Sequence, residues 1–157
     1  MALAPKDAAT RERPDIRLDP DEQAAFLREQ SKAALATIDT DGYPHVVAMS
    51  YCVKDGAFYM TSYGKAQKVL NIRRNPKVGL MIEAGASYGE LRGVMVRGTC
   101  EIIEGAPAVE EAFADMAAAR GQPRRRESIA SAPKRVVLKV VPHKLTSWDH
   151  RKLGGRY

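Results

Sequence analysis

The chain has 157 residues and a formal charge of +6, with 45% hydrophobic and 28% charged residues. This length suits one domain with a real core, and the composition is ordinary for a soluble globular protein. No apolar run approaches the ~20 residues of a membrane span, and the charged N-terminus lacks the apolar core of a signal peptide, so we expect a cytoplasmic protein. Cys52 and Cys100 lie in β-rich runs without metal-site spacing, which predicts buried free thiols and no metal site.

The first part of the chain predicts an arm followed by a short helix. Residues 1–17 mix proline, alanine and charge without periodicity, so we expect a flexible arm before a single domain of residues 18–157. A helix is expected to begin at Asp19, which can cap it, because Pro20 fits the first turn and Glu22 stands at the capping-box position. We expect this helix to run to about Ser31.

Three short strands joined by tight turns are expected next. The turn signals are Thr40-Asp41-Gly42 and Lys54-Asp55-Gly56, and the runs around them are apolar or β-rich. We expect the strands at 33–39, 44–53 and 57–62.

The second half of the chain predicts further strands and two more helices. Asn75-Pro76 ends the helix that we expect at 64–74. Gly93 and Gly98 lie within a long strand and indicate a bulge or a barrel bend. We expect helices at 64–74 and 106–120, strands at 77–84, 91–103 and 135–141, a polar loop at 121–133, and a tail from Pro142. Six strands with tight turns and short helices predict a mainly β, antiparallel barrel rather than a doubly wound sheet.

The segment from Tyr59 to Pro76 carries the clearest candidate site. A strand delivers the hydroxyls of Thr61 and Ser62 to a glycine-containing turn, and a basic helix begins directly after it. The first turn of a helix presents free N–H groups and the positive end of its dipole, so these groups with Lys65 and Lys68 can cradle a phosphate. A capped surface helix with solvated lysines accounts for the same residues equally well.

This segment resembles the split-barrel flavin/deazaflavin oxidoreductases, a superfamily related to pyridoxamine 5′-phosphate oxidase. The similarity lies in the strand ending in Thr/Ser, the lysine-rich turn and the run Asn71-Ile72-Arg73-Arg74-Asn75-Pro76, and in the hairpin 36–46. The ending 147–155 resembles the actinobacterial subgroup that uses coenzyme F-420, an 8-hydroxy-5-deazaflavin. The resemblance covers roughly residues 20–155 and implies a six-stranded antiparallel split β-barrel with short flanking helices.

The resemblance also implies a homodimer with a cofactor between the subunits. Lysines would hold the cofactor phosphate, second-strand residues would line the isoalloxazine pocket, and tail residues would approach a cofactor held mainly by the partner chain. The implied cofactor-binding residues are Pro44, His45, Val47, Met49, Thr61, Ser62, Lys65, Lys68, Asn71, Arg74, Trp148 and Lys152. A packed aromatic role for Trp148 and a hydrogen-bonded structural role for His45 are the competing interpretations.

The implied reaction is hydride transfer from a reduced deazaflavin to an electron-poor small molecule, such as an enone, a quinone or a conjugated bilin. No catalytic residue is assigned, and Tyr51, Tyr59 and Lys152 are candidate proton donors. FMN in the same fold, or a non-catalytic deazaflavin- or haem-binding protein, are the alternatives. The cations at 65–77 and 124–126 favour the more anionic F-420. Nucleic-acid binding is disfavoured, because no aromatic residues are interleaved with the arginines.

Overall fold

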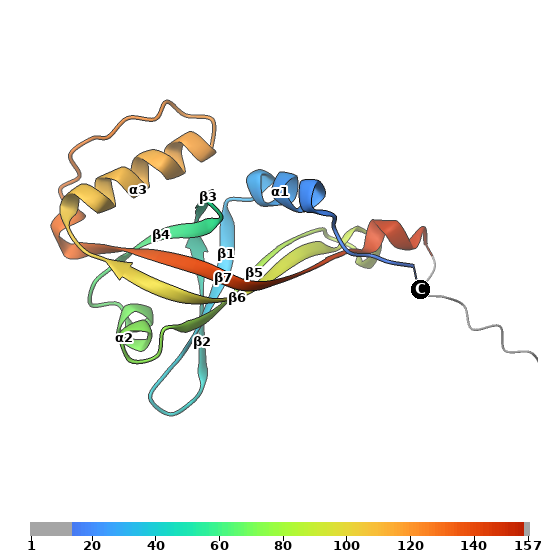
Figure 1. The fold of residues 1–157 in the computed structure, drawn as a ribbon, viewed down its shortest axis with the longest axis horizontal. Helices are drawn as coiled ribbons and strands as arrows, with labels where there is room; N and C mark the ends of the chain where they lie inside the picture. The colour runs from blue at the N-terminus through green and yellow to red at the C-terminus, as the bar shows by residue number, and fades with distance from the viewer. Residues whose placement is uncertain (1–13, 156–157) are drawn as a thin grey trace, which may run out of the picture.

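The computed structural model describes residues 14–155, which form one curled antiparallel sheet with short helices around it (Figure 1). The strands of the sheet are β1 (Lys32–Ile38), β2 (Pro44–Ser50), β3 (Cys52–Lys54), β4 (Ala57–Tyr63), β5 (Lys77–Ala84), β6 (Arg92–Ile103) and β7 (Arg135–Asp149). The α-helices are α1 (Pro20–Glu29), α2 (Gln67–Arg74) and α3 (Ala106–Ala119), and the 3-10 helices are η1 (Tyr88–Glu90), η2 (Ala132–Lys134) and η3 (His150–Leu153). The predicted mainly β, antiparallel split-barrel class is confirmed.

The sheet curls because its two edges are joined by a single residue. The strand order is β2-β1-β5-β6-β7-β4-β3, so β2 and β3 are the edge strands, and only Tyr51 separates them in the chain. Tyr51 is buried, and its hydroxyl donates to the carbonyl of Leu27 at 2.8 Å, which fixes this crossing beneath α1. The predicted strand at 44–53 is therefore two strands, and the described sheet has seven strands instead of six.

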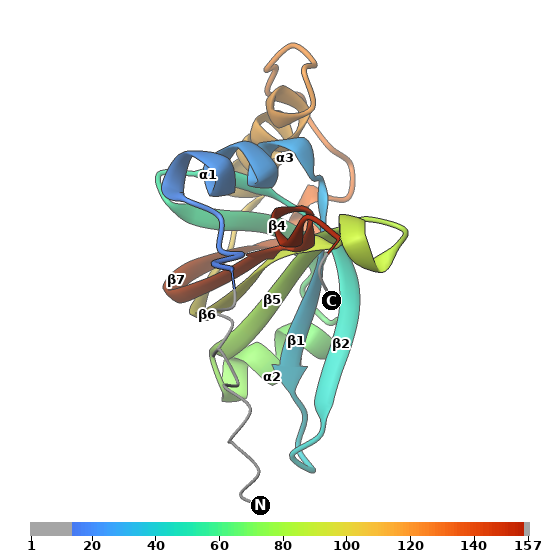
Figure 2. The same ribbon diagram turned by 90° about the vertical axis from the view of Figure 1, so that its right-hand side faces the viewer.

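The hydrophobic core lies inside the curl. Alternate residues of each strand face inward, as in β1, where Ala33, Leu35 and Thr37 are buried. Fully buried side chains from β4 to β7 complete this core, among them Met60, Leu80, Ile82, Val94, Val96, Leu138 and Val140. A smaller cluster under α3 contains Val109, Ala112 and Val137. Figure 2 shows α1 and α3 at one end of the curled sheet and α2 at the other.

The predicted start of α1 is confirmed in atomic detail. The Asp19 carboxylate accepts from the Glu22 backbone N–H at 2.9 Å, and the Glu22 carboxylate accepts from the Asp19 N–H at 2.8 Å. Pro20 occupies the first turn, where its missing N–H costs nothing. The helix ends at Glu29, slightly earlier than expected.

The last strand is longer than the sequence predicts. β7 continues to Asp149, whereas we expected a strand at 135–141 and a tail from Pro142. Pro142 pairs with Gly98 at a bulge in the β6–β7 ladder, and a bulge is where a strand tolerates a residue without an N–H. An added Cβ at Gly98 would lie 2.5 Å from the Val141 carbonyl oxygen, so only glycine permits this approach.

Gly93 of β6 lies directly beneath Trp148 of β7. A Cβ at Gly93 would lie 2.4 Å from Trp148 Cζ2 and 2.8 Å from the Ile82 carbonyl oxygen. We expect Gly93→Ala to lower the free energy of unfolding by about 1–3 kcal/mol, because the indole must move. Gly79→Ala is the matched control, since its added carbon would meet atoms no closer than 3.8 Å. Equal stability of the two variants in denaturant unfolding would contradict this packing.

The described residues also bear on the cysteines and on the predicted arm. Cys52 and Cys100 are buried free thiols, as expected. Burial raises the pKa of Cys52 to about 11 and that of Cys100 to about 12, so both stay protonated at neutral pH. No helix within residues 14–155 is long and apolar enough to cross a membrane. Most of the predicted arm, residues 1–13, lies outside the described residues.

Candidate functional site

One hollow lies between β2, at one edge of the sheet, and β4, beside the other edge. Its volume is about 410 Å³, and we call it the ring hollow. Met49 and Thr61 line it from the strands, and Phe113 and Met116 cover it from α3. Polar groups are added to the lining by Ser50, Arg120, Gln122 and Arg135. Such a mixed lining suits a flat, partly polar ring.

A second hollow, of about 670 Å³, opens beside the turn between β4 and α2, and we call it the basic hollow. Lys65 lines it from the turn, Arg73 from α2 and Lys134 from η2. Glu104 also lines it, but this carboxylate is paired with Arg73 at 2.6 Å. Lys65 and Lys134 form no ion pair with any described residue, so the hollow keeps a positive field that favours an anion.

Arg135 lines both hollows. Its guanidinium carbon lies 4.1 Å from the ring centroid of Tyr63 and 5.5 Å from that of Phe113, and its Nε donates to Ser131 Oγ at 3.1 Å. These contacts hold the charge at the boundary between the two hollows. The sequence alone does not indicate Arg135 as a site residue, because its position depends on the pairing of Arg135 with Tyr63 across β7 and β4.

The first turn of α2 has no side-chain cap. Ala66 is the N-cap residue, and the first turn contains no acidic residue. The backbone N–H groups of Gln67 and Lys68 have no hydrogen-bond partner in the described part of the chain. These amides, the helix dipole and the half-buried Lys68 lie together where the sequence predicts an anion-binding helix start.

A buried polar chain fixes α2 to the β1–β2 hairpin. Asn71 is fully buried, its Nδ2 donates to Thr37 Oγ1 at 3.0 Å, and its Oδ1 accepts from Gln67 Nε2 at 2.8 Å. Thr37 Oγ1 in turn donates to the His45 carbonyl at 3.4 Å, and Arg74 Nη2 donates to the backbone carbonyl that follows Thr37, at 2.7 Å. Asn71 and Arg74 therefore position the helix, and their expected role of shaping a phosphate turn stays a prediction.

The family model for pyridoxamine 5′-phosphate oxidase matches residues 19–149. The chain belongs to the pyridoxamine 5′-phosphate oxidase family. The matched residues run from the N-cap of α1 to the end of β7, so every element that lines the two hollows lies within the family domain.

Several solved structures resemble this family member. A conserved hypothetical protein from Mycobacterium tuberculosis is 36% identical, with a TM-score of 0.81 over 94% of this chain and 95% of that chain. An F-420 reductase is 28% identical, with a TM-score of 0.64 over 81% of this chain and 98% of that chain. A putative 5-nitroimidazole antibiotic resistance protein from Bacteroides thetaiotaomicron is 18% identical, with a TM-score of 0.74 over 84% of each chain, and supports the fold alone. Among curated proteins the search gave no match.

In this pyridoxamine 5′-phosphate oxidase-family chain, the two predicted hydroxyls lie on opposite faces of β4. Thr61 lines the ring hollow, whereas Ser62 is buried and its Oγ donates to the Tyr63 carbonyl at 3.4 Å.

The predicted second-strand residues are also divided between two faces. His45, Val47 and Met49 share the inner face of β2, and Pro44 is exposed at its start. Of these four residues, Met49 lines the ring hollow. The Nδ1 atom of His45 is buried without a hydrogen-bond partner among the described residues, while its carbonyl accepts from Thr37.

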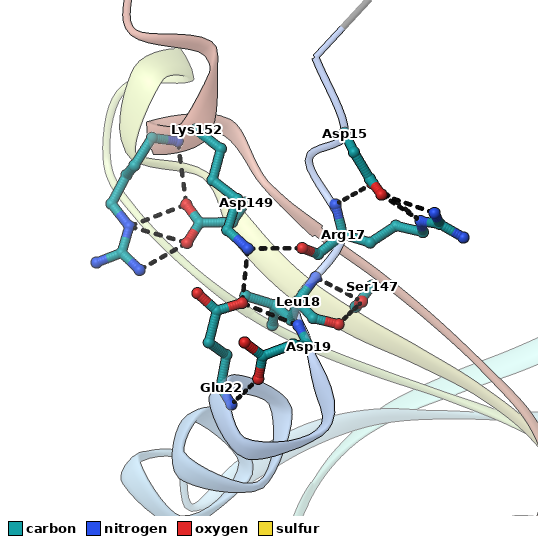
Figure 3. Close-up of polar contacts among 9 residues, drawn as sticks. Asp15, Arg17, Leu18, Asp19, Glu22, Ser147, Asp149 and Lys152 are labelled. Atoms are coloured by element: carbon teal, nitrogen blue, oxygen red, sulfur yellow. Dashed lines mark hydrogen bonds and ion pairs between the residues drawn. The ribbon is translucent and has the colours of Figure 1, made fainter.

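The end of β7 and η3, which carry the predicted tail residues Trp148 and Lys152, lie at the opposite end of the sheet from α2 (Figure 1). Trp148 packs on Gly93. Lys152 Nζ donates to the Arg17 carbonyl at 2.7 Å and to the Glu22 carboxylate at 2.6 Å (Figure 3). Within one chain Lys152 therefore holds the segment before α1, and neither Trp148 nor Lys152 lines the two hollows.

Asp149 anchors the same contact between the chain ends. It is buried, its backbone N–H donates to the Ile16 carbonyl at 2.7 Å, and its carboxylate accepts from Arg151 Nε at 2.9 Å and Nη2 at 2.6 Å. The Arg151 side chain lowers the pKa of Asp149, against the opposing effect of burial. The ionised form therefore adds stability above the pKa of the unfolded state, and this stability is lost as the pH falls through the lower folded pKa.

We expect Asp149→Asn to lower the free energy of unfolding by about 1–2 kcal/mol at neutral pH. The difference from the wild type should begin to shrink below about pH 4 and should vanish only below the lowered folded pKa, where the wild-type carboxyl is also neutral. Denaturant unfolding at a series of pH values measures this difference. A difference that stays constant across the series would show that the ion pair is not its source.

The arginines at 124–126 do not add the free positive charge that the sequence analysis assigned to them. Arg124 contacts Glu111 and pairs with Asp115 at 2.7 Å, and Arg126 pairs with Glu110 at 3.3 Å. Acidic residues of α3 therefore offset most of this charge, which corrects that expectation.

The three candidate proton donors line neither hollow. Tyr51 donates to a carbonyl inside the core, and burial raises its pKa. Tyr59 packs against the cluster under α3, and Lys152 is paired with Glu22. No general acid is assigned to the site.

Proposed function

We propose that this protein is an oxidoreductase that binds coenzyme F-420 across the ring hollow and the basic hollow. The observation that carries the proposal is that the two hollows share Arg135, one having apolar side chains of α3 among polar groups and the other being lined by cations. A flat ring with an anionic tail suits this pair of surfaces. The family membership supports a flavin-type cofactor, and the likeness to an F-420 reductase and to a mycobacterial protein favours the deazaflavin subgroup.

The residues present suit such a cofactor. Lys65, Lys68 and the free amides at the start of α2 would hold its phosphate, and Lys134 and Arg135 would attract the carboxylates of its tail. Met49 and the α3 side chains would keep water from the ring. When bound, the cofactor supplies hydride-transfer chemistry toward an electron-poor acceptor such as an enone, a quinone or a conjugated bilin.

We propose further that the protein works as a homodimer in which the apolar row around Met81 and Met95, on the outer face of the sheet, meets a second copy. Cross-strand pairs place Ala34, Ala48, Met81 and Met95 in one row of this face. Met81 and Met95 are each 41% exposed. A second copy would cover this apolar row. A monomer in sedimentation at micromolar concentration with cofactor present would count against this assembly.

The choice of cofactor is tested by fluorescence titration with F-420 and FMN at low and high ionic strength. FMN carries one phosphate and no carboxylate tail, so F-420 engages more of the cations. We expect F-420 to bind more tightly than FMN and to lose more affinity as salt rises, because exposed charge pairs are screened. Tighter FMN binding at both salt levels would overturn the assignment of F-420 and leave the fold untouched.

A further inference from the structure

We propose a second anion-binding site, on the outer face of the sheet, for a small molecule with two or more phosphate or carboxylate groups. A hollow of about 610 Å³ lies at the β6–β7 bulge, and we call it the bulge hollow. Lys77 of β5, Arg97 of β6 and Lys144 of β7 line it, with His143 beside them. It has no lining residue in common with the ring hollow or the basic hollow.

The sheet itself builds the bulge hollow. Arg97 pairs directly with Lys144 on one side and with Gly79 on the other. Because Gly79 has no side chain, space is left beside the Arg97 guanidinium. The bulge inserts His143 into β7, so that His143 and Lys144 are both exposed in succession, which regular alternation would not allow.

The charges in the bulge hollow are uncompensated. Like charges placed directly opposite on neighbouring strands destabilise a sheet, and Arg97 and Lys144 form such a pair. No acidic residue lines the hollow, and Lys77, Arg97 and Lys144 form no ion pair within residues 14–155. Glu101, on the same strand as Arg97, is already paired with Lys139 at 3.0 Å. A bound anion would offset this repulsion.

The donor groups suit phosphate or carboxylate oxygens. The Arg97 guanidinium is a planar fork that can bind two oxygens at once, and the lysine ammonium groups add point charges. The His143 ring is held by a 2.6 Å contact between its Nε2 and Thr99 Oγ1. The hollow has the volume of a small-ligand pocket, so it fits a compact polyanion.

Calorimetric titration of the full chain with inorganic diphosphate and with citrate tests the site. We expect saturable binding, with the tighter of the two probes identifying phosphate or carboxylate as the preferred group. Arg97→Gln and Lys144→Gln should each lower the affinity roughly three- to tenfold, and high salt should weaken binding. Lys32→Gln is the matched control, because Lys32 is an exposed cation at the start of β1.

Thermal melting gives a second measurement, in which Lys144→Gln is expected to act in opposite directions without and with the anion. Without anion, Lys144→Gln should melt at the same temperature as the wild type or higher, because a like-charge pair is removed. With diphosphate or citrate, whichever binds more tightly, the wild type should gain more in melting temperature than the variant. The site is overturned if neither probe binds, if Arg97→Gln binds as the control does, or if Lys65→Gln alone abolishes binding.

Discussion

Lys68→Ala is expected to lower the affinity for coenzyme F-420 roughly ten- to a hundredfold, and adding Lys65→Ala should lower it further. Both lysines lie where the free amides of α2 begin, and each would lose a charge-assisted contact to the cofactor phosphate. The melting temperature should stay unchanged, because neither lysine forms an ion pair with another described residue. Fluorescence titration beside a thermal melt measures both effects.

The matched control for the lysine pair is Arg28→Ala, which removes an exposed cation in the last turn of α1 that lines neither hollow. We expect the control to bind the cofactor as the wild type does. Unchanged affinity in the Lys65/Lys68 variant would remove the start of α2 from the proposed binding site.

Asn71→Ala should lower the free energy of unfolding by about 2–4 kcal/mol. The substitution removes a fully buried amide and leaves the Thr37 hydroxyl and the Gln67 amide without their partner. Because Asn71 also fixes α2 to the hairpin, we expect weaker cofactor binding in the same variant. Denaturant unfolding and cofactor titration provide the two measurements.

The control for Asn71 is Gln67→Ala, which breaks one bond of the same chain from its exposed end. Gln67→Ala should lower the free energy of unfolding by less than about 1 kcal/mol, because water can replace an exposed partner. If the two variants were equally stable, the buried amide could not be what holds α2 in place.

Local chemistry explains which elements the sequence could predict. The capping pattern from Asp19 to Glu22 sets the start of α1 without help from the rest of the fold. Asp55 and Gly56 have φ values of 49° and 75°, the left-handed backbone that a tight hairpin turn requires. Such signals depend on neighbouring residues only, so they can be recognised in a single sequence.

The two errors in the strands have a non-local cause. The break at Tyr51 exists because the chain passes there from one sheet edge to the other. β7 passes Pro142 because Gly98 on the neighbouring strand accommodates a bulge. Neither the strand break at Tyr51 nor the continuation of β7 past Pro142 can be predicted without the strand order.

The same division applies to the candidate site. Lys65, Lys68 and Asn71 are close in sequence, so the start of α2 was predicted as a unit. Arg135 and Phe113 come from distant elements and reach the hollows only through the β4–β7 pairing and the packing of α3. Sequence proximity could not reveal them.

The most direct test of the proposed function is the rate at which reduced F-420 is oxidised under anaerobic conditions. The assay would contain the full chain and a panel of quinone, enone and bilin acceptors. We predict that the protein accelerates oxidation by at least one acceptor, and that the Lys65/Lys68 variant loses most of this acceleration at limiting cofactor. Oxidation no faster than in the absence of protein, across the whole panel and at cofactor concentrations that saturate binding, would contradict an F-420-dependent oxidoreductase.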